Sequence, residues 1–234
     1  MGKVVLFKNN KGGVGKSLLT FWTAHAMTTQ LTKKFKILIL TSDNQNNILH
    51  FAGIKNNFGK GLEDYIEKGS GELIRLRENL MYIPLTTTKI KSSFEKKFID
   101  LIELFKKQYD YIFIDGSPVL ELDNVFIKIS DSIVIPSQME YASVSGVVNV
   151  INNSVGSDIA AIVPNMFTKT KIEKEYYANL IETVADTKTK VILPINQSAF
   201  IGTLTEKGKT IWETKSKKAD GIKESLAEIV EVIY

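Results

Sequence analysis

The chain has 234 residues, of which 44% are hydrophobic and 24% are charged, and these proportions are typical of one globular domain over residues 1–234. Cysteine is absent, which excludes disulfides, thiolate catalysis and cysteine-ligated metal clusters, and the two histidines, His25 and His50, are isolated from each other. No apolar run approaches the roughly 20 residues that a membrane-spanning helix requires. We therefore expect a cytoplasmic protein, and its net charge of +4 permits contact with a polyanion without predicting it.

Short apolar runs, rich in Val and Ile and without two-residue alternation, recur along the chain. They predict buried strands over residues 4–7, 37–40, 81–85, 111–114, 133–135, 159–163 and 191–193. Helical spacing of apolar residues predicts helices over residues 17–31, 93–107, 143–153, 172–185 and 222–233. This alternation indicates a doubly wound α/β domain, with a mostly parallel sheet and helices on both faces. Residues 44–61, rich in Asn and Gly, are predicted to form a mobile loop after the second strand.

The most specific motif follows the first predicted strand and opens the first predicted helix. It reads Lys11-Gly12-Gly13-Val14-Gly15-Lys16-Ser17. Glycines allow successive backbone N–H groups to point inward at an anion, and the helix that begins there adds the positive end of its dipole. The Lys16 side chain would contact the β and γ phosphates of a nucleotide, and the Ser17 hydroxyl would ligate Mg²⁺.

A general phosphate loop would have its first glycine at position 10, where this chain has Asn10. With an additional lysine at its start, the run from Lys11 to Ser17 resembles the deviant Walker A motif of the ParA/MinD family of ATPases. The resemblance implies a P-loop NTPase fold, ATP and Mg²⁺ as ligands, and catalytic roles for Lys11 and Lys16. It also implies an ATP-dependent sandwich homodimer in which Lys11 reaches the phosphates of the partner subunit. Leu18, directly after the motif, joins the nucleotide-binding residues by the same resemblance.

Two further segments carry the resemblance. Residues 41–45 are similar to the family's Asp-x-Asp-Pro-Gln switch, which implies that Asp43 orients the attacking water and lies near Mg²⁺. Thr41 replaces the first Asp of that switch and Asn44 replaces its Pro; the Thr41 hydroxyl could still hold a coordinated water, with less electrostatic pull than a carboxylate. Residues 109–118 resemble the Walker B strand and its switch, so that Asp115 would hold Mg²⁺ through water and the Gly116 N–H would approach the γ-phosphate.

The later matches are shorter. Residues 130–136 are similar to a strand of the family, and residues 162–165 to the segment whose Asn reads the adenine base. The resemblance therefore assigns Asn165 to the base, with Pro194 in a following loop that flanks it.

The family includes proteins with different tasks. The lack of cysteine excludes the branch that carries an iron–sulfur cluster, and Tyr234 alone does not make the tyrosine-rich tail of the autokinases. A MinD-like protein needs a basic amphipathic helix at its carboxyl end, whereas the polar residues of segment 217–234 include Glu224, Glu228 and Glu231. We therefore expect this segment to pack on the core and expect no membrane contact.

ParA-type partition of a plasmid or chromosome remains as the favoured function. In this mechanism the ATP-bound homodimer binds DNA without sequence preference and so associates with the nucleoid. A centromere-binding adaptor protein stimulates its slow hydrolysis of ATP. Seven lysines against two glutamates in residues 188–218 are candidate DNA contacts: Lys188, Lys190, Lys207, Lys209, Lys215, Lys217 and Lys218. A solvated lysine-rich surface explains them equally well. A MinD-like positioning ATPase on a membrane or protein surface, and a nucleotide-sensing switch with little turnover, stay open as alternatives.

Overall fold

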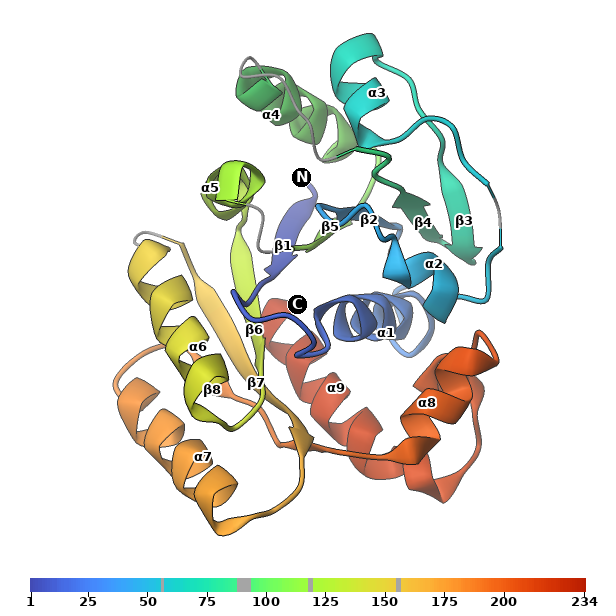
Figure 1. Ribbon diagram of the computed structural model, residues 1–234. Helices are drawn as coiled ribbons and strands as arrows, with labels where there is room; N and C mark the ends of the chain where they lie inside the picture. Colours follow the sequence, from blue (N-terminus) through green and yellow to red (C-terminus); the bar gives the residue numbers. More distant parts are fainter. Residues whose placement is uncertain (56, 88–93, 118–119, 155–156) are drawn as a thin grey trace.

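A mostly parallel sheet forms the centre of the computed structural model, which describes residues 1–55, 57–87, 94–117, 120–154 and 157–234 (Figure 1). Its strands are β1 Lys3–Phe7, β2 Ile37–Thr41, β3 Ile74–Arg77, β4 Leu80–Ile83, β5 Tyr111–Asp115, β6 Ser132–Ser137, β7 Ile159–Phe167, β8 Lys190–Val191 and β9 Ile195–Asn196. Within the described residues their order is β3-β4-β2-β5-β1-β6-β7-β8, with β9 also paired to β7. Every pair is parallel except β3 with β4.

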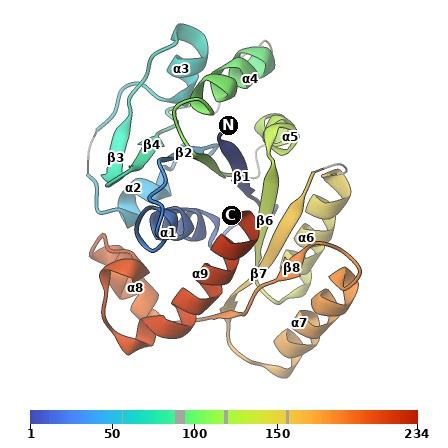
Figure 2. The same ribbon diagram turned by 180° about the vertical axis from the view of Figure 1, so that it is seen from behind.

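Helices cover both faces of this sheet (Figures 1 and 2). One face carries α1 Lys16–Thr29, α2 Asn47–Phe51, α8 Ala199–Glu206 and α9 Asp220–Ile233. The other face carries α3 Leu62–Lys68, α4 Phe94–Phe105, α5 Leu120–Ile129, α6 Tyr141–Asn153 and α7 Lys171–Val184. Two short 3₁₀ turns, η1 Ile211–Glu213 and η2 Lys217–Ala219, link α8 to α9. None of the helices in the described part of the chain combines the length and apolar character needed to cross a bilayer.

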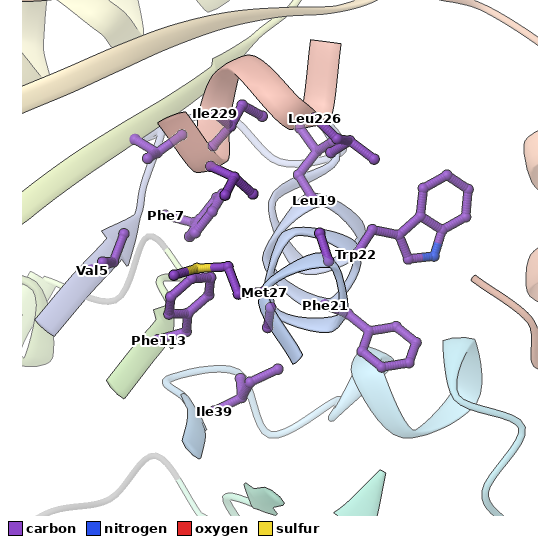
Figure 3. Packing of buried hydrophobic residues seen from close by; sticks show 14 of the residues in the cluster. Val5, Phe7, Leu19, Phe21, Trp22, Met27, Ile39, Phe113, Leu226 and Ile229 are labelled. Atoms are coloured by element: carbon purple, nitrogen blue, oxygen red, sulfur yellow. The ribbon is translucent and has the colours of Figure 1, made fainter. Parts of the chain in front are cut away.

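The central strand shows why the apolar runs lack alternation. Val5 and Phe7 of β1 pack under α1 and α9, whereas Val4 and Leu6 face the layer of α4 to α6 on the other side (Figure 3). Both faces of the central strands are therefore removed from water, and their interior positions are apolar without alternation. The doubly wound α/β class expected from the sequence is confirmed.

Several elements differ from the sequence-based expectations. The predicted mobile loop over residues 44–61 contains helix α2. Residue 56 of this loop, and Ser93 at the predicted start of the second helix, lie outside the described residues. The strand expected over residues 191–193 covers only Lys190–Val191. The sequence also missed β3, β9, α3, α5 and α8. These elements are short or lie at the sheet edge, where tertiary contacts rather than a long apolar pattern stabilise them.

Candidate nucleotide-binding site

The loop between β1 and α1 has the backbone geometry of an anion-binding loop. Gly13 and Gly15 have φ angles of 75° and 94°, which glycine adopts without strain. A Cβ at Gly15 would lie 2.2 Å from the Asn165 amide nitrogen, so no larger residue fits there. Among the described residues no side chain caps the amino end of α1, and its first turn holds no acidic residue. The positive end of the helix dipole therefore faces the space above the loop.

A cavity of about 460 Å³ opens over this loop, at the carboxyl ends of β1, β2 and β5. Such a volume is ordinary for a small-molecule site, and the carboxyl edge of a parallel sheet is where ligands bind in doubly wound folds. Its lining comprises Gly12, Gly13, Gly15, Lys16, Ser17, Leu18, Asp43, Asn47, Phe51, Asp115, Gly116, Ser117 and Met166. The fold thus brings the phosphate loop together with the two predicted carboxylates.

Opposite charges are buried in the floor of the cavity. Lys16 is 8% exposed and its ammonium donates a hydrogen bond to the Lys11 carbonyl, at 2.8 Å. Burial raises the pKa of Asp115 to about 6, against the opposing effects of a hydrogen bond with Ser17 and the charge of Lys16. The predicted Mg²⁺ residues Ser17 and Asp115 are therefore in contact. A hydroxyl beside a buried carboxylate, open to a cavity, is an oxygen donor set that suits Mg²⁺.

Lys11 lies at the edge of this site, and its side chain contacts residues near the start of α6 in the same chain. Its ammonium forms an ion pair with Glu140, the residue before α6, and donates to Gln138 Oε1 at 3.4 Å. The Lys11 side chain is 32% exposed. Lys11 does not line the cavity, and its predicted role across a dimer stays a prediction.

Asp43 projects from the loop after β2. Its carboxylate lines the cavity and accepts a hydrogen bond from the Gln45 backbone N–H at 2.9 Å. The Thr41 hydroxyl accepts from the Asp43 backbone N–H at 3.0 Å, and Thr41 is only 1% exposed. Thr41 therefore supports the loop from inside, and the role of its hydroxyl toward a coordinated water stays a prediction.

The segment after β5 is held by backbone hydrogen bonds in this structure, and the approach of the Gly116 N–H to a γ-phosphate stays a prediction. The Gly116 N–H donates to the Phe7 carbonyl at 3.0 Å, and a Cβ at Gly116 would lie 2.9 Å from that oxygen. Gly116 nevertheless lines the cavity. The Ser117 N–H donates to the Ser42 hydroxyl at 2.6 Å, which joins the loops after β2 and β5. Pro118 lies outside the described residues.

The predicted base-reading residues lie beside the cavity and not in its lining. Asn165 is 3% exposed, and its side-chain amide donates to the Val14 carbonyl at 2.9 Å, so it supports the phosphate loop here. Pro194 is half-buried in the segment between β8 and β9. Adenine recognition by these two residues stays a prediction.

Sequence reasoning missed four residues of the cavity lining. Asn47 and Phe51 belong to α2, in the segment predicted as a loop, Ser117 follows Gly116, and Met166 directly follows Asn165. Met166 has a φ angle of 55°, which turns the chain at this position of β7. The one available signal was its place beside an assigned base-reading residue.

The seven candidate DNA-binding lysines do not all lie together. Lys190 forms an ion pair with Glu231 near the end of α9, at 3.5 Å, whereas Lys217 and Lys218 belong to η2, just before the start of α9. A helix of 14 residues spans about 21 Å. Five of the seven are exposed residues between α8 and α9, namely Lys207, Lys209, Lys215, Lys217 and Lys218.

Comparison with known sequences relates this chain to nucleotide-binding proteins. A family model described as an AAA domain matches residues 2–158. The sporulation initiation inhibitor protein Soj of Bacillus subtilis is 31% identical over 166 residues, which cover 65% of this chain and 64% of Soj, less than two thirds of its length. An uncharacterized ATP-binding protein of Methanocaldococcus jannaschii is 25% identical, with 98% of this chain and 90% of that protein covered.

Solved structures of the same fold extend over nearly the whole chain. A variant of McdA from Cyanothece in complex with ATP has a TM-score of 0.84 at 14% identity, covering 99% of this chain and 96% of that one. A protein described as a plasmid partition protein of Borrelia burgdorferi, bound to AMPPNP, has a TM-score of 0.77 at 19% identity and covers 99% of both chains. MinD of Aquifex aeolicus, in its complex with MinC, has a TM-score of 0.79 at 18% identity, covering 98% and 96%.

Proposed function

Because this chain belongs to the ParA/MinD-type P-loop ATPases, we propose that it is an ATPase that partitions a plasmid or chromosome. In this proposal it binds ATP with Mg²⁺, closes into a sandwich homodimer and binds DNA without sequence preference. A centromere-binding adaptor protein stimulates its slow hydrolysis. The observation that carries the proposal is the single cavity in which Lys16, Ser17, Asp43 and Asp115 meet at the end of the phosphate loop.

The residues of the cavity would have different roles in phosphoryl transfer. Lys16 and the amino end of α1 neutralise phosphate charge, and Ser17 with Asp115 would hold Mg²⁺. The bound Mg²⁺ supplies charge that stabilises the transferring phosphoryl group. Asp43, half-buried at the cavity mouth, orients the attacking water. Lys16 and Ser17 begin α1, Asp115 ends β5 and Asp43 lies in the loop after β2, so the fold positions these groups in the absence of a nucleotide.

Lys11 gives the proposed dimer its dependence on ATP. In the single chain its charge is satisfied by Glu140, so reaching a partner's nucleotide requires breaking that ion pair. Exposed ion pairs contribute only about 0.2–1 kcal/mol, which the phosphates of a bound nucleotide can outweigh.

Asp43→Ala tests the catalytic part of the proposal. The variant should bind ATP and dimerise but lose turnover, because the carboxylate acts on water in the transition state. Sedimentation with ATP and Mg²⁺ measures the dimer, and phosphate release measures turnover. Asp100→Ala, an exposed carboxylate of α4, is the control and should behave as wild type. A monomeric Asp43→Ala protein beside a dimeric wild type would contradict the water-orienting role.

An electrophoretic shift with duplex DNA of arbitrary sequence tests whether DNA is the surface that the ATP-bound protein binds. The wild type should shift DNA in the presence of ATP and Mg²⁺ and not in their absence. Dimerisation without any DNA shift would favour a membrane or protein surface, as in the MinD-like alternative. Binding of ATP without turnover, even with DNA present, would favour a nucleotide-sensing switch.

A further inference from the structure

Asn46 occupies an unusual backbone position between Asp43 and α2. Its φ and ψ angles are 49° and 41°, the left-handed region, although it is not glycine. Asn is among the few residues that adopt this conformation at low cost. Asn46 is 5% exposed and does not line the cavity, whereas Asp43 on one side and Asn47 on the other both do.

The buried side chain of Asn46 uses its full hydrogen-bonding capacity. Its amide nitrogen donates to the Leu85 and Asn44 carbonyls, both at 2.8 Å. Its oxygen accepts from the Leu85 backbone N–H at 2.9 Å and from the Tyr82 hydroxyl at 2.8 Å. Two of these bonds pair Asn46 with the backbone of Leu85, just beyond β4. The loop after β2 is therefore fastened to the neighbouring strand by one residue.

Tyr82 connects this fastening to the other end of the loop. It is fully buried in β4, and its hydroxyl lies beside the Thr41 side chain at the end of β2. Thr41 in turn accepts from the Asp43 N–H at 3.0 Å, and the Asn46 N–H donates to the Asp43 carbonyl at 3.1 Å. Both backbone polar groups of Asp43 are thus held by this network. The Asp43 carboxylate is left to face the cavity.

We propose that Asn46 and Tyr82 are positioning residues for ATP hydrolysis, which hold the Asp43 carboxylate at the cavity mouth without touching the nucleotide. This inference rests on the proposed ATPase function. Asn44, Gln45 and Asn47 are exposed polar residues, so the burial of apolar side chains contributes little to the position of the loop that carries Asp43. Its geometry is set by the buried hydrogen bonds, and a displacement of about 1 Å at a reacting group can lower a rate about 100-fold.

Asn46→Gly and Tyr82→Phe test the proposal. Glycine keeps the left-handed backbone and removes all four side-chain bonds, while phenylalanine removes one hydroxyl. Asn79→Gly is a matched control, because Asn79 also has a positive φ, 57°, in the turn between β3 and β4. We expect kcat to fall about 10- to 100-fold in Asn46→Gly and severalfold in Tyr82→Phe. ATP affinity, measured with a fluorescent analogue, should stay within about twofold of wild type in all three, and Asn79→Gly should keep its kcat.

Amide hydrogen exchange gives a second measurement that does not depend on turnover. Residues 43–52 should exchange faster in Asn46→Gly than in wild type, with unchanged exchange in residues 11–18. A merely structural role would instead lower ATP affinity and thermal stability together with kcat. Wild-type kcat and wild-type exchange in both variants, beside an inactive Asp43→Ala, would overturn the inference and leave the ATPase proposal standing. Absence of turnover in the wild type itself would overturn the ATPase proposal, and exchange would still decide whether Asn46 holds the loop.

Discussion

Lys16 and Asp115 are opposite charges removed from water in one cavity, at 8% and 3% exposure. Burying an ionised group is costly unless partners compensate, and here the Lys11 carbonyl and the Ser17 hydroxyl do so in part. The raised pKa of Asp115 shows that compensation is incomplete without further positive charge. A magnesium nucleotide would supply both the anion for Lys16 and the cation for Asp115, so the site is polarised before its ligand arrives.

Replacing Lys16 by Ala should abolish nucleotide binding. The variant removes the main positive charge beside the phosphates, and truncating one partner of a buried charged hydrogen bond costs about 2–5 kcal/mol, or roughly 30-fold or more in affinity. Equilibrium binding of a fluorescent ATP analogue measures it, with Lys97→Ala on the exposed side of α4 as control. Near-normal affinity in the Lys16 variant would remove the phosphate-loop assignment.

His25 predicts a specific acid sensitivity of the fold. It belongs to the buried face of α1 and is 5% exposed, with Nδ1 2.7 Å from the Thr210 hydroxyl, and burial lowers its pKa to about 4 against the raising effect of Glu213. The unfolded chain, with a histidine pKa near 6.5, therefore binds the proton first as pH falls. Stability should be fully present above about pH 6.5 and fall by an amount on the order of 3 kcal/mol as pH drops to about 4.

Urea unfolding at several pH values between 7.5 and 4 checks this, with His25→Gln as the comparison. The variant has no group that titrates at this position, so its stability should depend less steeply on pH over the same window. Parallel pH profiles for the two proteins would show that His25 has no part in the acid sensitivity.

At the scale of elements, the carboxyl ends of α2 and α8 pack directly against each other. Gly53 and Gly208 follow these helices with φ angles of 72° and 63°, and a Cβ on Gly208 would lie 2.5 Å from the Gly53 Cα. Arg77 of β3 joins them, donating to the Ala52 carbonyl at 3.2 Å and the Gly208 carbonyl at 2.6 Å. The same guanidinium is bidentate to Glu213 of η1, at 2.9 and 3.1 Å. The helix that lines the cavity is thereby fixed to the lysine-bearing segment.

Gly208→Ala should destabilise the protein by more than about 1 kcal/mol, because the methyl group meets backbone atoms and the left-handed conformation disfavours alanine. Gly202→Ala is the internal control, since Gly202 lies within α8 and nothing lies within 4 Å of its Cβ position. That change should stabilise by roughly 0.5–1 kcal/mol. Thermal or urea unfolding measures both, and equal effects of the two substitutions would contradict the close packing.

At the scale of the whole molecule, five exposed lysines lie in the segment between α8 and α9, with Lys217 and Lys218 beside the start of α9, whereas Lys190 forms an ion pair with Glu231 near the other end of that helix. Dimerisation would double this basic surface, which is how ATP would turn weak phosphate contacts into stable DNA binding. The position of each lysine on the folded chain matters more here than the net charge of +4.

Replacing Lys215, Lys217 and Lys218 together by Ala should weaken binding to every DNA sequence alike. The dependence of affinity on log salt should flatten by about one slope unit per lost phosphate contact, while ATP hydrolysis without DNA persists. The control variant replaces Lys96, Lys97 and Lys107 on the opposite layer, which changes the net charge equally. Identical affinities and salt slopes for both triple variants would show that Lys215, Lys217 and Lys218 have no specific role in DNA binding.

The sequence by itself determined the features that depend on consecutive residues. The central strands have continuous apolar interiors because both faces are covered, and the phosphate loop requires its glycines and lysines in one short run. Both patterns are local, so the α/β class, the sheet's interior and the residues from Gly12 to Leu18 could be predicted without a structure.

Only the tertiary structure decided which distant residues complete the site. The ion pair of Lys11 with Glu140, the contact of Arg77 with Glu213 and the fastening of Asn46 to Tyr82 and Leu85 join residues 36 to 136 positions apart. The same holds for the separation of Lys190 from Lys217 and Lys218 along α9. A single polar residue carries no periodic pattern that reveals its partner, and its role follows from which chain segments the packed sheet and helices bring within hydrogen-bonding distance.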